Sequence, residues 1–248
     1  WVSVFTAISA FCNAGFDLFG RFGDYSSLVP YVNNYYVQAV IMFMIMAGGL
    51  GFMVWVELAE YRKKRRLSLH AKVVLQFSVI LWVGGAVLLA LLEWSNPRTM
   101  GGLSVPGKIM AALFQSVSTR TAGMNTIDLA ACSPISKLLM SVLQFIGAAP
   151  GSTGGGVKVT TFAVLILTIR SVAQGRDDCV IGGHHIESKT VYRALTIIVI
   201  GAVAAFGSAV VVYYNTAETV SVIDCIFESC SAFGTVGLSV GVTGQLNT

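Results

Sequence analysis

Residues 227–237 read Phe-Glu-Ser-Cys-Ser-Ala-Phe-Gly-Thr-Val-Gly, and the interpretation of the whole chain starts from this stretch. It closes a short apolar segment, Val222–Phe233, which has too few residues to cross a hydrocarbon core that needs about 20. The segment ends in a glycine-containing turn, and such backbone survives inside a bilayer only when it is buried in protein or lines a water-filled path. The stretch therefore predicts a half-helix that enters a membrane partway, followed by a loop.

The same pattern occurs twice more. Residues 5–15 read Phe-Thr-Ala-Ile-Ser-Ala-Phe-Cys-Asn-Ala-Gly, and residues 114–123 read Phe-Gln-Ser-Val-Ser-Thr-Arg-Thr-Ala-Gly, one residue shorter. They close the short apolar segments Trp1–Phe11 and Val105–Val117. The final glycines, roughly 110 residues apart, are Gly15, Gly123 and Gly237. Repetition at this period predicts a unit made of a span, a half-helix, a glycine loop and a second span.

The composition supports a membrane protein. Apolar residues make up 55% of the chain, charged residues only 11%, and the mean hydropathy is +0.75. A soluble domain has roughly 25% charged residues, so this chain is too poor in charge to cover a soluble surface. The net charge of +4 is too small and too scattered to favour nucleic acid. We therefore expect membrane lipid around the chain and no nucleic-acid partner.

Four apolar stretches are long enough to span a bilayer. They are Tyr35–Val56, Val73–Leu92, Ala194–Tyr214 and Leu138–Ile169, the last interrupted by a glycine-rich insert. The cluster Arg62–Arg66 follows the first span, and Arg170, Arg176, Lys189 and Arg193 flank the connection before the last one. The positive-inside rule places both connections in the cytoplasm.

The three loops carry the candidate chemistry. Repeated glycine loops around an axis form a constriction, and glycine permits the positive φ that turns successive carbonyl oxygens toward that axis. Carbonyl oxygens can replace the hydration shell of a monovalent cation without adding fixed charge. The candidate ion-binding residues, through their backbone, are Asn13, Ala14, Gly15, Thr121, Ala122, Gly123, Thr235, Val236 and Gly237.

The chain resembles the Trk/Ktr/HKT superfamily of potassium transporters, most closely the ion-translocating membrane subunit of bacterial Ktr systems. The motifs that carry the resemblance are residues 9–17 (Ser-Ala-Phe-Cys-Asn-Ala-Gly-Phe-Asp), 119–128 (Thr-Arg-Thr-Ala-Gly-Met-Asn-Thr-Ile-Asp), 231–239 (Ser-Ala-Phe-Gly-Thr-Val-Gly-Leu-Ser) and 149–158 (Ala-Pro-Gly-Ser-Thr-Gly-Gly-Gly-Val-Lys). The third motif contains the Thr-Val-Gly signature of potassium-channel filters.

The resemblance implies an all-α membrane fold of four pseudo-repeats around a central pore. Residues 1–66 would then end the second repeat, 67–189 form the third with a broken span, and 190–248 begin the fourth, with the first repeat and the last span outside this chain. It implies potassium uptake across the cytoplasmic (inner) membrane by a multi-pass protein, with K⁺ at Asn13, Gly15, Thr121, Gly123, Thr235 and Gly237. It also implies activation by or accompaniment with Na⁺, a homodimer, and a cytoplasmic nucleotide-binding regulatory ring on a separate chain, with no nucleotide bound to this one.

The insert in the third span matches the intramembrane gating loop of the superfamily. Its residues are Gly147, Pro150, Gly151, Ser152, Thr153, Gly154, Gly155, Gly156 and Lys158. Proline and adjacent glycines cannot continue a helix, so the insert predicts two half-helices joined by a segment that rearranges at small torsional cost.

Several alternatives remain open at this point. An alternating-access cation symporter would use the same insert as a broken-helix substrate site. An enzyme is disfavoured, because Ser152 and Thr153 have no neighbouring base in the sequence. Glu228, inside a half-helix, needs a partner, and Arg120 is a candidate for it. The acids that follow the loops, Asp17, Asp24 and Asp128, either attract cations or are ordinary surface residues.

Overall fold

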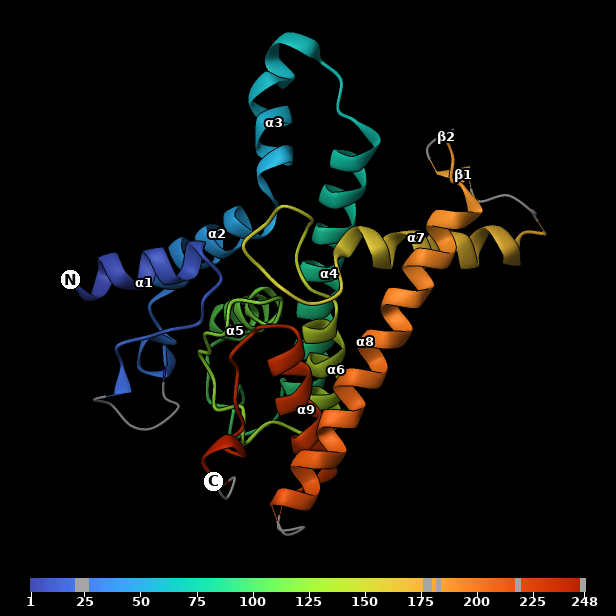
Figure 1. The fold of residues 1–248 in the computed structure, drawn as a ribbon. Helices are drawn as coiled ribbons and strands as arrows, with labels where there is room; N and C mark the ends of the chain where they lie inside the picture. Colours follow the sequence, from blue (N-terminus) through green and yellow to red (C-terminus); the bar gives the residue numbers. More distant parts are fainter. Residues whose placement is uncertain (21–26, 176–179, 182–183, 217–219, 246–248) are drawn as a thin grey trace.

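The computed structural model describes residues 1–20, 27–175, 180–181, 184–216 and 220–245. The described part is all-α, as predicted, apart from the short 3₁₀ turns η2 and η3 and one hairpin of two strands with two residues each (Figure 1). The helices are α1 (Val2–Phe11), α2 (Tyr35–Gly49), α3 (Phe52–Lys64), α4 (Leu69–Glu93), α5 (Val105–Ser118), α6 (Pro134–Phe145), α7 (Val159–Ala173), α8 (Ser188–Asn215) and α9 (Val222–Phe233). The remaining elements are η2 (Val29–Tyr31), η3 (Thr243–Gln245) and the antiparallel strands β1 (Val180–Ile181) and β2 (His184–His185).

Two helices, α4 and α8, are long and apolar enough to cross a membrane by themselves. Both expose rows of large apolar side chains, including Ile80 and Leu91 on α4 and Ile200 and Val203 on α8. Such rows cost free energy in water and are stable against lipid. Both helices run from the upper to the lower side of the molecule in Figure 1, so the α3–α4 turn and the start of α8 lie on one side, as the charge pattern predicts.

The three short apolar segments form α1, α5 and α9, as predicted. Serine caps begin two of them: Ser104 accepts from Gly107 N at the start of α5, and Ser221 accepts from Ile223 N at the start of α9. Each half-helix packs on neighbouring helices, α1 on α2, α5 on α4 and α2, and α9 on α8 and α6. The phenylalanines that open the second and third copies of the motif, Phe114 and Phe227, are fully buried. The motif therefore encodes packing as well as the loop.

The predicted span Tyr35–Val56 is not one straight helix. The chain bends by 98° between α2 and α3. Gly51 has φ +83°, and a Cβ there would lie 2.5 Å from Pro150 O. Phe52 N, freed by the bend, donates to Gly151 O at 3.1 Å. The expectation of a continuous span was wrong because the glycine-rich insert between α6 and α7 occupies the break.

The predicted span Leu138–Ile169 is interrupted, as expected. Helix α6 ends at Phe145, an irregular segment follows, and α7 begins at Val159 and runs across the direction of α6 in Figure 1. Ser133 caps α6 by accepting from Ser136 N. The glycine-rich insert is thereby held at the level of the glycine loops, next to the break between α2 and α3.

Candidate functional site

The three glycine loops share one backbone conformation. In each loop the first and third residues have positive φ, and the residue between them does not. The φ values are 49° and 74° for Asn13 and Gly15, 79° and 77° for Thr121 and Gly123, and 53° and 86° for Thr235 and Gly237. Positive φ in a non-glycine residue costs about 1–3 kcal/mol and persists only where the surroundings impose it. Because positive φ recurs at equivalent residues of all three loops, the surroundings of each loop impose the same backbone conformation.

A serine of each half-helix holds the loop that follows. The hydroxyl donates to the carbonyl of the residue directly after the loop glycine. The three bonds are Ser9 Oγ to Phe16 O at 2.7 Å, Ser118 Oγ to Met124 O, and Ser231 Oγ to Leu238 O at 2.6 Å. The sequence pattern identified these serines by their repetition, but it did not predict this role.

The loops also meet one another. A Cβ on Gly123 would lie 2.0 Å from Val236 O and 2.9 Å from Gly15 Cα. A Cβ on Gly15 would lie 3.0 Å from Val236 O and 3.1 Å from Ala122 O. Only glycine therefore fits at Gly15 and Gly123, where backbone carbonyls of different units converge. A Cβ on Gly237 would meet no described atom within 4 Å, so the third loop faces open space on that side.

The glycine-rich insert lies against the first residue of all three loops. Asn13 Nδ2 donates to Thr153 Oγ1 at 2.8 Å. A Cβ on Gly154 would lie 2.1 Å from Thr121 Oγ1, and a Cβ on Gly155 would lie 2.2 Å from Thr235 Oγ1. Three consecutive residues of the insert thus contact three equivalent positions of the loops. The sequence predicted both segments, and the structure brings them together.

Backbone hydrogen bonds join the two ends of the insert and connect the insert to the end of α2. Gly147 N donates to Val157 O at 2.8 Å, and Ala149 N donates to Gly49 O at 3.0 Å. Lys158 Nζ turns back to Gly154 O at 2.5 Å. The remaining predicted residues lie in the turn between these points, where Ser152 N donates to Ala149 O at 3.2 Å and Gly151 and Gly156 have positive φ.

The sequence left open whether Arg120 reaches Glu228, and in the structure the two side chains have different partners. Its guanidinium donates to Gly147 O at 2.9 Å and to Ser78 O at 3.5 Å, and it lies over the Trp82 ring at 5.6 Å. The side chain is buried. Arg120 directly precedes Thr121 of the second loop, and it therefore connects that loop to the start of the insert.

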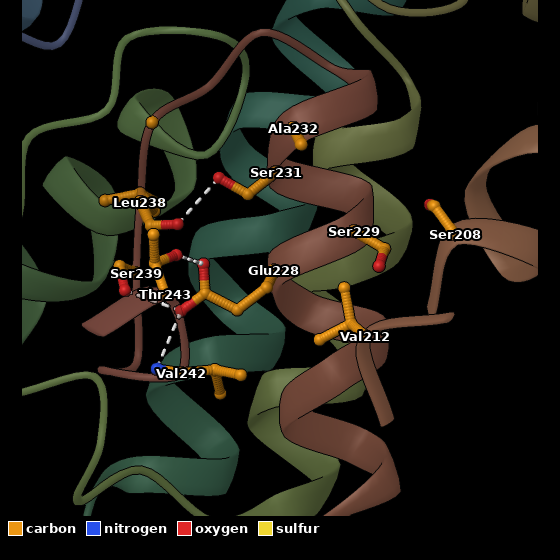
Figure 2. Close-up of a pocket in the computed structure, with 11 residues that line it drawn as sticks. Ser208, Val212, Glu228, Ser229, Ser231, Ala232, Leu238, Ser239, Val242 and Thr243 are labelled. Carbon is orange, nitrogen blue, oxygen red and sulfur yellow. Dashed lines mark hydrogen bonds between the residues drawn. The ribbon is translucent and has the colours of Figure 1, made fainter. Parts of the chain in front are cut away.

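Glu228 holds the segment that follows the third loop (Figure 2). Its Oε1 accepts from Ser239 Oγ at 2.5 Å, Val240 N at 3.0 Å and Val242 N at 3.2 Å, and its Oε2 accepts from Thr243 Oγ1 at 3.1 Å. Glu228, Ser239, Val242 and Thr243 line a cavity of about 490 Å³ between α8, α9 and that segment. This partly buried acid finds four donors in the segment after the third loop, which explains why it needs no basic partner.

The acids after the first two loops stabilise local turns. Asp17 Oδ1 accepts from Phe19 N at 2.9 Å, and Asp128 Oδ1 accepts from Ala130 N at 2.9 Å. Asp24 lies outside the described residues.

The sequence did not predict the roles of three charged side chains, Glu93, Lys137 and Asp224. Glu93 is fully buried and accepts from Ser136 Oγ, Thr99 Oγ1, Asn96 Nδ2 and Ser133 N at 2.5–2.9 Å. Lys137 forms an ion pair with Asp224. In the sequence, Glu93 directly follows the apolar stretch Val73–Leu92 and Lys137 directly precedes Leu138–Ile169, and this placement is what could have indicated them.

Two helices of membrane-spanning length, three equivalent half-helices and their converging glycine loops define a polytopic membrane protein built on pseudo-repeats. The chain belongs to the TrkH family, described as cation transport protein, whose family model matches residues 1–248. It is therefore an integral membrane protein of a family of transporters, and this family is not one of enzymes.

Its relatives include transporters from several bacteria. The chain is 36% identical over 248 residues to the potassium/sodium uptake protein NtpJ of Enterococcus hirae, covering 99% of this chain and 54% of that protein. It is 38% identical to the Ktr system potassium uptake protein B of Vibrio alginolyticus, covering 99% and 53%. The crystal structure of the potassium transporter TrkH from Vibrio parahaemolyticus shares the fold, with a TM-score of 0.71 at 18% identity over 96% of this chain and 52% of that one. The chain thus spans about half the length of these relatives.

Proposed function

We propose that this chain forms part of a potassium-uptake pore in the cytoplasmic membrane. The observation that carries the proposal is the convergence of three loops with the same alternation of φ, which places carbonyl oxygens of Ala122 and Val236 beside Gly15. Carbonyl groups gathered around one point suit a partly dehydrated monovalent cation. The names of the relatives, potassium and potassium/sodium uptake proteins, support the same ion class.

Potassium would be bound by backbone oxygens of the residues predicted from the sequence, Asn13 to Gly15, Thr121 to Gly123 and Thr235 to Gly237. Only the third loop has the full Thr-Val-Gly form. We therefore expect rubidium to replace potassium well and sodium to be excluded less sharply than by a strict potassium channel. Sodium would also activate or accompany transport.

The insert would act as the gate. Its residues Thr153, Gly154 and Gly155 contact the first residue of each loop, which is where a plug would block the path. Arg120 holds the start of the insert through Gly147 O, and rearrangement of the glycine-rich segment would clear the path.

The chain would supply three of four units: residues 1–66, 67–189 and 190–248. The open side of Gly237 would face the remaining unit. We also propose a homodimer controlled by a cytoplasmic nucleotide-binding ring, since relatives bear the name of Ktr system components.

The test uses the full-length protein in bacteria that lack their own potassium uptake. Rubidium influx would be followed with and without sodium, for the wild type and for Gly237→Ser. Uptake that is lost, or that becomes sodium-permeable, supports the cation filter. No uptake from protein shown to be in the membrane, with its partner present, would favour an alternating-access carrier for another substrate.

A further inference from the structure

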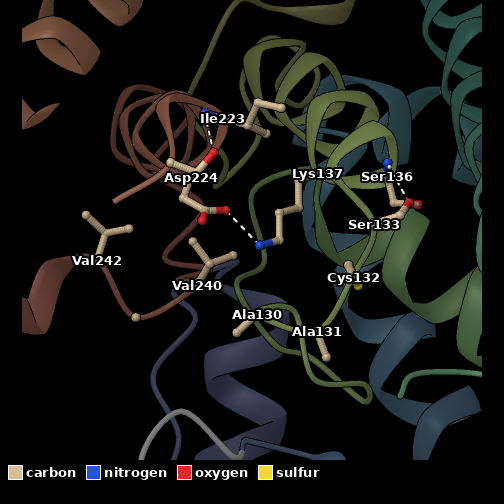
Figure 3. A network of polar contacts seen from close by, with 12 residues as sticks. Ala130, Ala131, Cys132, Ser133, Ser136, Lys137, Ile223, Asp224, Val240 and Val242 are labelled. Atoms are coloured by element: carbon tan, nitrogen blue, oxygen red, sulfur yellow. Dashed lines mark hydrogen bonds and ion pairs between the residues drawn. The ribbon is translucent and has the colours of Figure 1, made fainter. Parts of the chain in front are cut away.

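A charged pair joins the third unit to the fourth. Lys137 lies in the first turn of α6 and Asp224 in the first turn of α9, and Lys137 Nζ lies 2.7 Å from Asp224 Oδ1 (Figure 3). The two side chains are only 10% and 21% exposed. The contact is therefore unlike a surface ion pair, which contributes little because water screens it. Removing one partner would leave a shielded charge without compensation.

The corresponding interface between the second and third units has no charges at these positions. Asn34 caps α2 by accepting from Val37 N, as Ser133 caps α6 by accepting from Ser136 N. Counting from these caps, Gln38 occupies the position of Lys137.

On the other side of the interface, Asp224 stands seven residues before the loop-holding Ser231, and Ala111 stands seven before Ser118. Helix α2 packs on α5 as α6 packs on α9. The charged pair is thus a specific feature of one interface and does not follow from the repeat.

Helix α9 controls the third loop from several points. Ser231 fixes Leu238 O after the loop, and Glu228 fixes the amides of Val240 and Val242. Asp224 lies one turn before Glu228 on the same helix, and Figure 3 shows Val240 and Val242 beside it. A shift of α9 relative to α6 therefore moves the loop and the segment after it together.

We propose that Lys137 and Asp224 are positioning residues that set the place of the third glycine loop and thereby its preference for potassium over sodium. The pair fixes α9 against α6, and α9 carries the Thr-Val-Gly loop. Small displacements of that loop change the distances between its carbonyl oxygens and a bound ion, and these distances discriminate between ions of different size. The proposal rests on the proposed cation uptake.

The test compares four changes in the full-length protein. The single variants Lys137→Met and Asp224→Asn break the pair. The exchanged double variant Lys137→Asp with Asp224→Lys restores it in reverse, and Lys137→Gln with Asp224→Ala reproduces the uncharged interface. The matched control is Glu60→Gln, which breaks the exposed Lys64–Glu60 pair with side chains 68% and 46% exposed. Each protein is quantified in the membrane, and its rubidium KM and its inhibition by sodium are measured.

We expect the single variants that reach the membrane to raise the rubidium KM or the sensitivity to sodium by at least about threefold, a barrier change of under 1 kcal/mol. The exchanged double variant should recover most of this loss, and Glu60→Gln should behave as wild type. If the single variants do not fold, the uncharged double variant decides the question, since it leaves no isolated charge.

Wild-type KM and sodium sensitivity in folded single variants, or in the folded uncharged double variant, would overturn the proposal. So would an exchanged variant that is folded but no better than the single changes. A wild-type protein without rubidium uptake would instead contradict the proposed function itself, which separates the two failures.

Discussion

Replacing Gly155 by alanine should open the proposed gate. A Cβ on Gly155 would lie 2.2 Å from Thr235 Oγ1, 2.8 Å from Cγ2 and 3.0 Å from Cβ. Ordinary contact requires about 3.4 Å or more, so the glycine-rich insert must move away from the third loop, which α9 holds in place, by roughly 1 Å. Rotation of the Thr235 side chain about its Cα–Cβ bond would not remove the clash. The Cβ of Thr235 would stay 3.0 Å from the added Cβ, and the branched side chain is stiff.

Overpacking of this kind costs about 1–3 kcal/mol. The cost falls on the closed arrangement alone, because the contact exists only while the insert lies under the loops. Since each 1.4 kcal/mol is a factor of ten, the balance between closed and open forms should shift about 5-fold to 150-fold toward open. Flux should rise toward its maximum, and the ratio of rubidium to sodium uptake should stay the same.

The assay is rubidium and sodium influx into cells that lack other potassium uptake, normalised to protein in the membrane. Gly84→Ala is the matched control, because a Cβ on that glycine of α4 meets no described atom within 4 Å. Reduced flux from correctly inserted Gly155→Ala protein, with Gly84→Ala unchanged, would refute the reasoning that the insert blocks the path.

Three further predictions concern the loops and their support. Gly123→Ala should lower the folded fraction after detergent extraction more than Gly237→Ala, since both have positive φ but only Gly123 faces a carbonyl at 2.0 Å; equal fractions would contradict the convergence of the loops. Ser118→Ala should cost about 1 kcal/mol and weaken rubidium selectivity by releasing Met124 O, and unchanged selectivity would remove the serine from the site. Glu93→Gln should lower the melting temperature without altering ion preference, since hydrogen bonds to a charged group contribute about 1.5–3 kcal/mol each; a shift in selectivity at constant stability would argue for a direct role.

The repeat made most of the architecture predictable from the sequence. Three copies of one motif around Ser9, Ser118 and Ser231 identified the half-helices and loops, and lengths of apolar sequence identified α4 and α8. Such features are periodic or local, and a single sequence records them directly.

Contacts between distant segments were not predictable in the same way. The break at Gly51 depends on Pro150, which lies about a hundred residues away, and the sequence around Gly51 reads as a continuous span. The partners of Arg120 could not be read from the sequence for a similar reason. A buried cation can be satisfied by carbonyl oxygens such as that of Gly147, and every residue offers such a carbonyl.

The bend between α2 and α3 has a mechanical consequence. Helix α3 spans Phe52–Lys64, about 20 Å at 1.5 Å per residue, and it ends in the basic turn Arg62–Arg66. Its base is fastened to the insert through Phe52 N and Gly151 O. Helix α3 is thus fixed at one end, beside the insert, and carries its positive charges at the other end. An anionic surface that attracts Arg62–Arg66 would therefore tend to rotate the helix about Gly51. A force exerted on this end of α3 would reach the glycine loops through the insert, without any ligand binding at the loops.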